Sequence, residues 1–362
     1  MARLETPTHP WAWWVWALLA AGAVSLTTNP LLLLLIAGAV AGVVMARRSD
    51  APWARSVTAY FALALVIVGF RVLMQIVFGG QRTGFALFTL PQVHLPAWAA
   101  GISLGGPVTL NAILSALYDG MRLAAIIICV GAANALANPR RALRSVPPAL
   151  HELSVAVVIA LSVAPQLVES LHRVRRARRL RGGAVKGWRA IPALVVPILE
   201  DAVERSLTLA TSMESRGYGR TRDLTRVPRW VGASLLVAVM LVTFGIFLLL
   251  GVPGGLWPGV VCLAVGVAAT VIGLHLSGKR LAVTRYRPDP WRWRESAVVA
   301  LGVGALLAIV AVTQLDPASL NPPTRPLSWP PLHPLFVLAA LLVVAPIAVT
   351  VPDAETTVRS PR

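Results

Sequence analysis

Two arginines stand directly before a glycine at points where a long helical pattern stops. Arg216 precedes Gly217 in "SMESRGYG", residues 212–219, and Arg181 precedes Gly182 in "RRLRGG", residues 178–183. A guanidinium is a planar donor that binds carboxylates through paired hydrogen bonds, so at a helix tip it can dock into an acidic groove of a partner. A cation in the last turn followed by glycine also marks an ordinary helix end. Both interpretations stay open on the dipeptides alone.

Other residue types that could do chemistry are sparse. Asp119 is the only carboxylate well inside a predicted membrane span, and Arg71 and Arg122 are the bases within spans. An unpaired charge in a bilayer is costly, so we expect Asp119 to pair with Arg71 or Arg122. The six histidines have no metal-ligand spacing, and neither a metal nor another cofactor is expected. "GLHLSGKR" (273–280) carries Arg280 where a phosphate-binding loop needs Ser or Thr.

The composition identifies the kind of molecule that carries these residues. Of the 362 residues 56% are hydrophobic and 13% are charged, and the mean hydropathy is +0.71. A soluble domain carries roughly a quarter charged residues, so we predict an all-α, polytopic integral membrane protein. The net charge of +18 does not indicate nucleic-acid binding, because there is no soluble domain to carry it. We expect no nucleic-acid partner.

Apolar runs near the length of a membrane-spanning helix, about 20 residues, predict eight spans. They are 11–27, 31–46, 54–78, 109–137, 230–250, 256–276, 296–314 and 334–351. With the N-terminus in the cytoplasm, 29 of the 33 lysines and arginines fall on the cytoplasmic side, as the positive-inside rule requires. A ninth run, 153–168, would break this pattern if it crossed. We therefore predict that it does not cross, and that both termini are cytoplasmic.

This topology predicts three parts: N-terminal spanning helices (1–138), a cytoplasmic helical unit (139–229) and C-terminal spanning helices (230–362). The middle unit is predicted to hold a short helix capped by Asn138, a helix from about 150 to 181, and another from about 190 to 216. Along the third helix an apolar seam recurs every three or four residues, which is typical of an amphipathic helix. Its members are Ile191, Val195, Ile198, Ala202, Ser206, Leu209 and Met213.

The middle unit resembles a known family. "LTLATSMESRGYG" is similar to the second Ala-Arg-Gly-type motif of the transmembrane T component of energy-coupling factor transporters, the EcfT/CbiQ family, and "HRVRRARRLRGG" resembles the first. "LTTNPLLLLLIAGAV" and "RYRPDPWRWRESAVVAL" are similar to the family's opening and to its final cytoplasmic-to-membrane passage. Leu180 and Ser215 stand where the family usually has alanine. The hairpin at 230–276 and the helix at 334–351 are additions to its usual spans.

The resemblance implies a mechanism and partners. Two ABC-type ATPases form a dimer under the coupling helices, and Arg181 and Arg216 each insert into a groove of one ATPase. A membrane S component captures a vitamin or a transition-metal ion, and ATP-driven movement of the coupling helices releases it inward. The chain would then be a non-enzymatic subunit of the plasma membrane, with Leu180, Arg181, Gly182, Ser215, Arg216 and Gly217 at the ATPase contact. The substrate is left open.

Two other functions remain alternatives. A polytopic membrane enzyme usually has clustered carboxylates or histidines at the membrane face, which this sequence lacks. A secondary transporter is expected to show inverted repeats and ionisable residues at mid-membrane. Only Arg71, Asp119 and Arg122 meet that description, and no repeat is evident.

Overall fold

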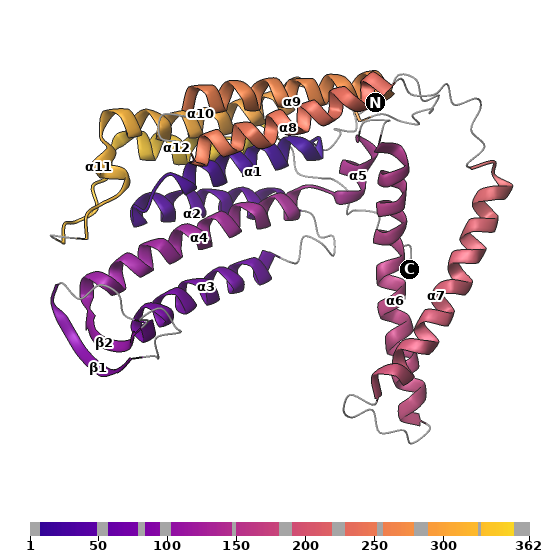
Figure 1. The fold of residues 1–362 in the computed structure, drawn as a ribbon, viewed down its shortest axis with the longest axis horizontal. Helices are drawn as coiled ribbons and strands as arrows, with labels where there is room; N and C mark the ends of the chain where they lie inside the picture. The colour runs from indigo at the N-terminus through magenta and orange to yellow at the C-terminus, as the bar shows by residue number, and fades with distance from the viewer. Residues whose placement is uncertain are drawn as a thin grey trace. The chain divides into compact units, whose positions relative to one another are not determined.

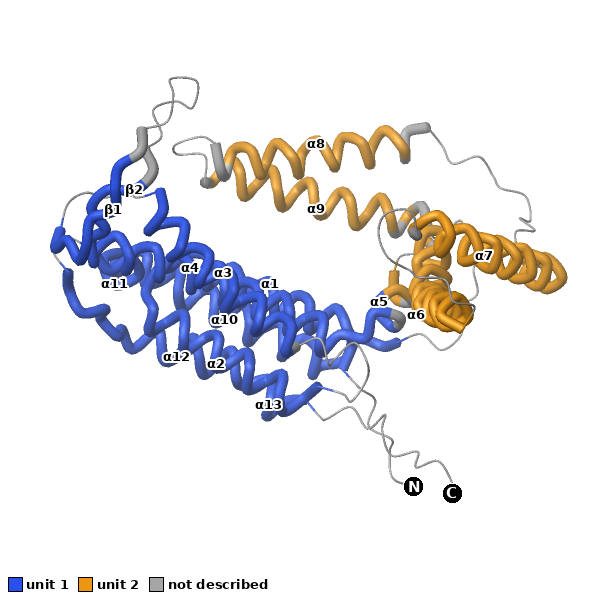
Figure 2. The backbone as a smooth tube through the Cα atoms, turned by 90° about the horizontal axis from the view of Figure 1, so that it is seen from below, with its two compact units in different colours: residues 1–142, 289–362 blue, residues 143–288 orange. Residues whose placement is uncertain are grey.

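The computed structural model describes residues 8–48, 57–78, 84–94, 103–146, 150–180, 190–218, 229–251, 256–278, 289–324 and 327–350. These residues form helices and one two-stranded hairpin (Figure 1), which confirms the all-α prediction apart from the hairpin. The chain divides into two compact units (Figure 2): residues 1–142 with 289–362, and residues 143–288. The second unit is thus an insertion in the first. The predicted three-part division follows membrane topology instead and stays a prediction.

Unit 1 is a helical bundle. Its helices are α1 (Pro10–Ser25), α2 (Pro30–Arg47), α3 (Val57–Phe78), α4 (Leu110–Leu136), α10 (Trp293–Leu315), α11 (Pro317–Leu320), α12 (Pro334–Val344) and α13 (Pro346–Val349), with the start of α5 (Pro139–Arg144). Several begin with a side-chain cap followed by proline, which suits the first helical position because it lacks an N–H. The Asn29 Oδ1 atom, for example, accepts a hydrogen bond from the Leu31 N–H at 3.0 Å.

The core of unit 1 lies between α1, α2, α4, α10 and α12. Trp16, Phe336 and Ile309 are fully buried there. Small residues allow neighbouring helices to approach closely: a Cβ added at Gly131 of α4 would lie 2.6 Å from the Tyr60 ring of α3, and one at Gly120 would lie 3.2 Å from the backbone of Val68 in α3. Such close approach is how helices associate in lipid, where the hydrophobic effect does not drive them together.

The turn between α1 and α2, in the sequence "TTNP", joins the N-terminal helices to the C-terminal part of the chain through hydrogen bonds. The Asn29 side-chain amide donates to the carbonyl of Ser319 at 2.8 Å and to that of Pro331 at 2.9 Å. The Thr27 hydroxyl donates to the carbonyl of Leu320 at 2.7 Å. Both polar side chains are fully buried. The turn therefore fixes the first two helices against α11 and the segment before α12.

A second set of polar contacts lies where the chain leaves unit 1 and returns to it. Arg141, in α5, donates two hydrogen bonds to the Asp289 Oδ2 atom, at 3.0 and 2.6 Å. Nearby, the buried carboxylate of Glu295 accepts from the backbone N–H groups of His9 at 3.2 Å and Arg292 at 2.9 Å. Burial lowers the pKa of His9, with a smaller opposing effect from Asp289. The neutral ring is the form whose Nδ1 atom caps α1.

The hairpin was not predicted. Strands β1 (Ala86–His94) and β2 (Ser103–Thr109) pair antiparallel between α3 and α4, with two irregularities in their register. Gly105 has a φ of +80°, and a Cβ there would lie 2.2 Å from the carbonyl oxygen of Pro91. Only glycine fits a left-handed position so close to another backbone. The Phe, Leu, Thr and Val residues of β1 favour a strand.

Unit 2 contains two helix pairs. Helices α6 (His151–Leu180) and α7 (Ala190–Ser215) contact each other, and α8 (Arg229–Gly251) packs along α9 (Leu256–Gly278) (Figures 1 and 2). The α8–α9 contact depends on glycines, because a Cβ at Gly245 or Gly266 would lie 2.7 Å from a backbone nitrogen of the other helix. The predicted helices at about 150–181 and 190–216 are confirmed. The Asn138 cap is also present, with the Arg141 N–H 3.4 Å from its Oδ1 atom.

The predicted number of eight spans is not confirmed. Among the described residues, six helices are long and apolar enough to cross a membrane: α2, α3, α4, α6, α9 and α10. Of the other predicted spans, α1 has 16 residues, and Pro346 divides the last run into α12 and α13. Helix α8 has 23 residues, but the side chains that the structure describes in it cover only Gly232–Leu248. Helix α6 qualifies because its apolar half has a mean hydropathy of 1.7 over 18 residues, and its basic second half continues the same helix without a break. Its predicted position outside the bilayer remains a prediction.

Cysteine labelling tests this position. We expect Leu150→Cys and Leu180→Cys, which are exposed and flank α6, to react with a membrane-impermeant maleimide from the same side of sealed vesicles. The reason is the base-rich second half of α6, which favours the cytoplasm. The background protein would have both native cysteines, Cys129 and Cys262, replaced by alanine. Labelling from opposite sides would show that α6 spans the membrane.

Candidate functional site

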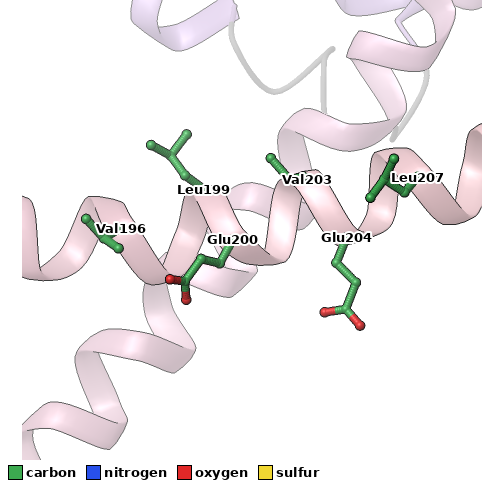
Figure 3. Close-up of a pocket in the computed structure, with 6 residues that line it drawn as sticks. All are labelled: Val196, Leu199, Glu200, Val203, Glu204 and Leu207. Atoms are coloured by element: carbon green, nitrogen blue, oxygen red, sulfur yellow. The ribbon is translucent and has the colours of Figure 1, made fainter.

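Helix α7 presents two different apolar faces. One packs toward α6 and contains Leu194, which is buried, and the half-buried Ile198. The other is a row of exposed side chains that line a shallow groove with two carboxylates, Glu200 and Glu204 (Figure 3). The apolar members of this exposed row are Val196, Leu199, Val203 and Leu207, with exposed fractions of 51%, 56%, 56% and 63%.

The exposed row differs from the seam predicted for this helix. Of the predicted seam, Ile198, Ala202 and Met213 are half-buried, whereas Ile191, Val195, Ser206 and Leu209 are exposed. The exposed row was missed although its members also recur every three or four residues. Sequence spacing identifies two apolar rows on α7 equally well, and only the contact with α6 distinguishes them.

A polar cluster holds α6 and α7 together where they cross. The Asp201 carboxylate accepts a hydrogen bond from the Ser170 hydroxyl of α6 at 2.7 Å and from the Arg205 Nε atom of α7 at 3.0 Å. Arg205 also donates to the Gln166 side chain of α6 at 3.2 Å. The hydrogen bond from Arg205, followed by that from Ser170, holds the pKa of Asp201 below its usual value. The crossing therefore contains an ionised carboxylate at neutral pH.

The end of α7 has the geometry of a Schellman motif. The Tyr218 N–H donates to the carbonyl of Met213 at 3.0 Å, and the Gly217 N–H donates to that of Glu214 at 2.9 Å. Gly217 has a φ of +74°, a left-handed conformation that favours glycine. Arg216 is exposed at this helix end. Gly217 thus ends the helix in a left-handed turn, as a glycine directly after the last helical turn allows.

The other predicted contact residues are placed only in part. Leu180, the last residue of α6, is 84% exposed, and Arg181 and Gly182 lie outside the described residues. Ser215 is exposed, and its hydroxyl donates to the carbonyl of Ser212 at 2.9 Å. The structure therefore gives the local geometry of the second arginine–glycine end but not of the first.

The three predicted intramembrane charges lie together. The Arg71 Nη2 atom is 3.2 Å from the Asp119 Oδ2 atom, and the Arg122 Nη2 atom is 3.6 Å from the Oδ1 atom. The prediction named either arginine, and the structure pairs Asp119 with both. This cluster joins α3 to α4 within unit 1. Each side chain is about one-third exposed, so the cluster is not a closed ion-binding cavity.

Across the described residues, no group of three His, Cys, Asp or Glu side chains could hold a metal ion.

Helix α2 has an open side at two glycines. A Cβ added at Gly38 or Gly42 would meet nothing within 4 Å, so these small residues do not serve packing within the described part of unit 1. Their side of α2 leaves room for a closely approaching neighbour.

Known proteins resemble this chain. The CbiQ family model, described as cobalt transport protein, matches residues 6–227. The energy-coupling factor transporter transmembrane protein EcfT of Leuconostoc gelidum subsp. gasicomitatum is 31% identical over 127 residues, which cover 31% of this chain and 47% of that protein. The protein of the same name from Bacillus subtilis is 35% identical over 121 residues, 31% of this chain and 44% of the relative.

A longer match is found with EcfT of Lactococcus lactis subsp. cremoris. It is 24% identical over 236 residues, which cover 60% of this chain and 82% of that protein. The chain thus spans less than half the length of the first two relatives and most of the third. The family match includes α1 to α7.

The charge cluster of unit 1 can be tested by exchange of its charges. We expect Asp119→Arg and Arg71→Asp each to lower the Tm in lipid nanodiscs, because each leaves like charges together. The double variant should recover part of the loss, with a coupling energy on the order of 1 kcal/mol, as measured for polar pairs in membrane proteins. If the loss of stability in the double variant equals the sum of the losses in the two single variants, the residues do not pair and the prediction is wrong.

The α6–α7 crossing should depend on pH through Asp201. Its pKa is lowered in the folded protein, so its stabilising effect is fully present above the unfolded value, about 3.9, and is lost as the pH falls through the lower folded value. We expect the distribution of distances between spin labels at Val168 and Glu204 to broaden as the pH falls through the folded pKa of Asp201. Asp201→Asn should show the broad distribution at neutral pH, whereas Glu200→Gln, the neighbouring exposed carboxylate, should not. Identical behaviour of the two variants would show that Asp201 does not hold the crossing.

Proposed function

This chain belongs to the CbiQ family of cobalt transport proteins, and from that membership we propose that it is the T component of an energy-coupling factor importer. It is a multi-pass membrane protein. In the proposed complex it receives movement from a pair of ABC-type ATPases at the cytoplasmic face and passes it to a membrane S component. The S component would carry a vitamin or a transition-metal ion. ATP hydrolysis would take place on the ATPase chains.

The observation that carries this proposal is the end of α7. Arg216 is exposed directly before the left-handed Gly217, in a helix end held by two backbone hydrogen bonds. An arginine placed in this way projects a bidentate donor from a rigid support and can enter an acidic groove. Arg181 would have the same role at the end of α6, by the resemblance of its motif.

The α6–α7 pair is suited to transmit movement. Each helix is long, 30 and 26 residues, and the pair is joined by the Asp201 cluster. A force applied at the tip of α7 therefore reaches α6 through hydrogen bonds between side chains. Two surfaces are available for contact with the S component. They are the exposed row of α7 and the side of α2 at Gly38 and Gly42, where nothing lies within 4 Å of an added Cβ.

The coupling role of the arginines can be tested in the assembled complex. An arginine seated in a partner groove typically contributes about 2–4 kcal/mol, a factor of roughly 30 to 1000 in affinity. An arginine that only interacts with a helix dipole contributes about 0.3–1 kcal/mol. We expect Arg216→Ala, alone or with Arg181→Ala, to leave the chain folded in the membrane but to release the ATPases on pull-down and to abolish ATP-driven uptake.

Arg179→Ala is the matched control, because it removes an exposed arginine from the last turn of α6 without touching either arginine–glycine pair. It should retain the ATPases. If the double variant also retains them and transports normally, both arginines are ordinary helix ends and the proposed coupling is wrong.

A further inference from the structure

The β1–β2 hairpin has an unusual surface for a segment that connects two membrane helices. Phe85, Leu87 and Phe88 are 72%, 47% and 47% exposed. Residues 83–109, which contain both strands and precede α4, include no Asp, Glu, Lys or Arg. A water-exposed segment of this length would carry about seven charged residues at the usual frequency. Exposed aromatic and aliphatic side chains in a segment without charge indicate contact with something apolar.

The hairpin is fixed to the end of α4. The Leu110 N–H donates to the carbonyl of Phe85 at 3.0 Å, which joins the base of β1 to the first residue of the helix. The Thr109 hydroxyl caps the same helix end, 3.3 Å from the Ala112 N–H. The Asn111 amide donates to the carbonyl of Thr324 at 2.7 Å. The apolar side chains are therefore held at the level where a spanning helix begins.

The hairpin also continues an apolar surface. Strand β2 packs against α3 and α4, and α3 exposes Phe70, Leu73 and Phe78 along the turns that lead to the hairpin. Helix α3 is among those long and apolar enough to span, and among its described side chains only Ala64 is buried within the protein. Its exposed apolar side chains are thus available to lipid, and the hairpin extends that surface beyond the helix end.

The backbone of the hairpin is poorly suited to bind a strand from another protein. Strand addition needs an uninterrupted row of N–H and C=O groups along an edge. Here each strand contains a proline, Pro91 in β1 and Pro107 in β2, and the register is broken at two places. Proline has no N–H to donate. Side-chain contact with an apolar medium fits the hairpin better than pairing of its edges.

We propose that the β1–β2 hairpin lies in the interfacial region of the bilayer and inserts Phe85, Leu87 and Phe88 among the lipids. Its depth is limited by its own edges, since unpaired backbone groups need water or headgroups and cannot enter the hydrocarbon core. The hairpin then acts as an interfacial anchor for the α3 and α4 ends. This role is independent of the proposed ATPase contact, because it concerns residues of unit 1 only.

Fluorescence quenching in liposomes provides the test. Full-length protein without Cys129 and Cys262 would carry a single cysteine at position 85, 87 or 88, labelled with the environment-sensitive dye NBD, in phosphatidylcholine–phosphatidylglycerol vesicles. The matched control is Ala318→Cys in α11, an exposed site in the same unit. We expect lipids with a nitroxide at the headgroup or shallow acyl positions to quench the hairpin labels several-fold more than the control, and aqueous iodide to quench them several-fold less.

Three results would overturn the proposal. Equal iodide quenching at hairpin and control positions would place the hairpin in water. Stronger quenching by nitroxides near the bilayer centre than by shallow ones would contradict the interfacial depth. Protection from iodide that appears only after the other transporter subunits are added would identify a protein-docking surface. The three label positions make the result independent of the folding of any one variant.

Discussion

The arrangement of the long helices α6 and α7 depends on the hydrogen bonds around the Asp201 carboxylate. Helix α7 and the first half of α6 expose apolar side chains at several positions, so apolar contact alone would permit many crossing positions. The hydrogen bonds from Ser170 of α6 to Asp201 and from Arg205 to Gln166 of α6 permit one, since a shift of α6 by one helical turn would separate both pairs. The cluster thus determines where α6 and α7 cross. The second apolar face of α7, away from α6, stays uncovered.

Unit 1 obtains its specificity in a different way. Inside lipid, apolar side chains do not discriminate between a helix and an acyl chain, so close backbone contact and buried polar groups determine which helices pair. The contact of Gly131 with Tyr60 and the hydrogen bonds of Asn29 illustrate the two kinds. The charge cluster of Arg71, Asp119 and Arg122 adds a third. Together these contacts determine which helices of unit 1 pair, without a large contribution from the hydrophobic effect.

Local chemistry made parts of this structure predictable. Gly217 ends α7 as expected because a left-handed residue after a helix has few alternatives to glycine, and Asp119 finds an arginine because a lone charge is costly in lipid. The hairpin and the exposed row of α7 were missed for the opposite reason. Apolar runs that connect spans look like further membrane sequence, and two apolar rows on one helix are equivalent until a neighbour covers one. Whether α6 crosses depends on charge placement across a bilayer, which its length and composition do not reveal.

The ion pair between Arg141 and Asp289 has a topological consequence. It joins the residue near which the chain departs from unit 1 to the residue at which it comes back, with 2.6 Å between the closest charged atoms. The intervening 143–288 segment is thus closed into a loop of the chain by a contact that lies within unit 1. Segments inserted in this manner are the ones that evolution can lengthen, exchange or remove with least disturbance to their host, since a short linker bridges the gap. The α8–α9 pair, which follows the residues that the family model matches, lies within that loop, where a helical hairpin could be acquired without rebuilding the bundle.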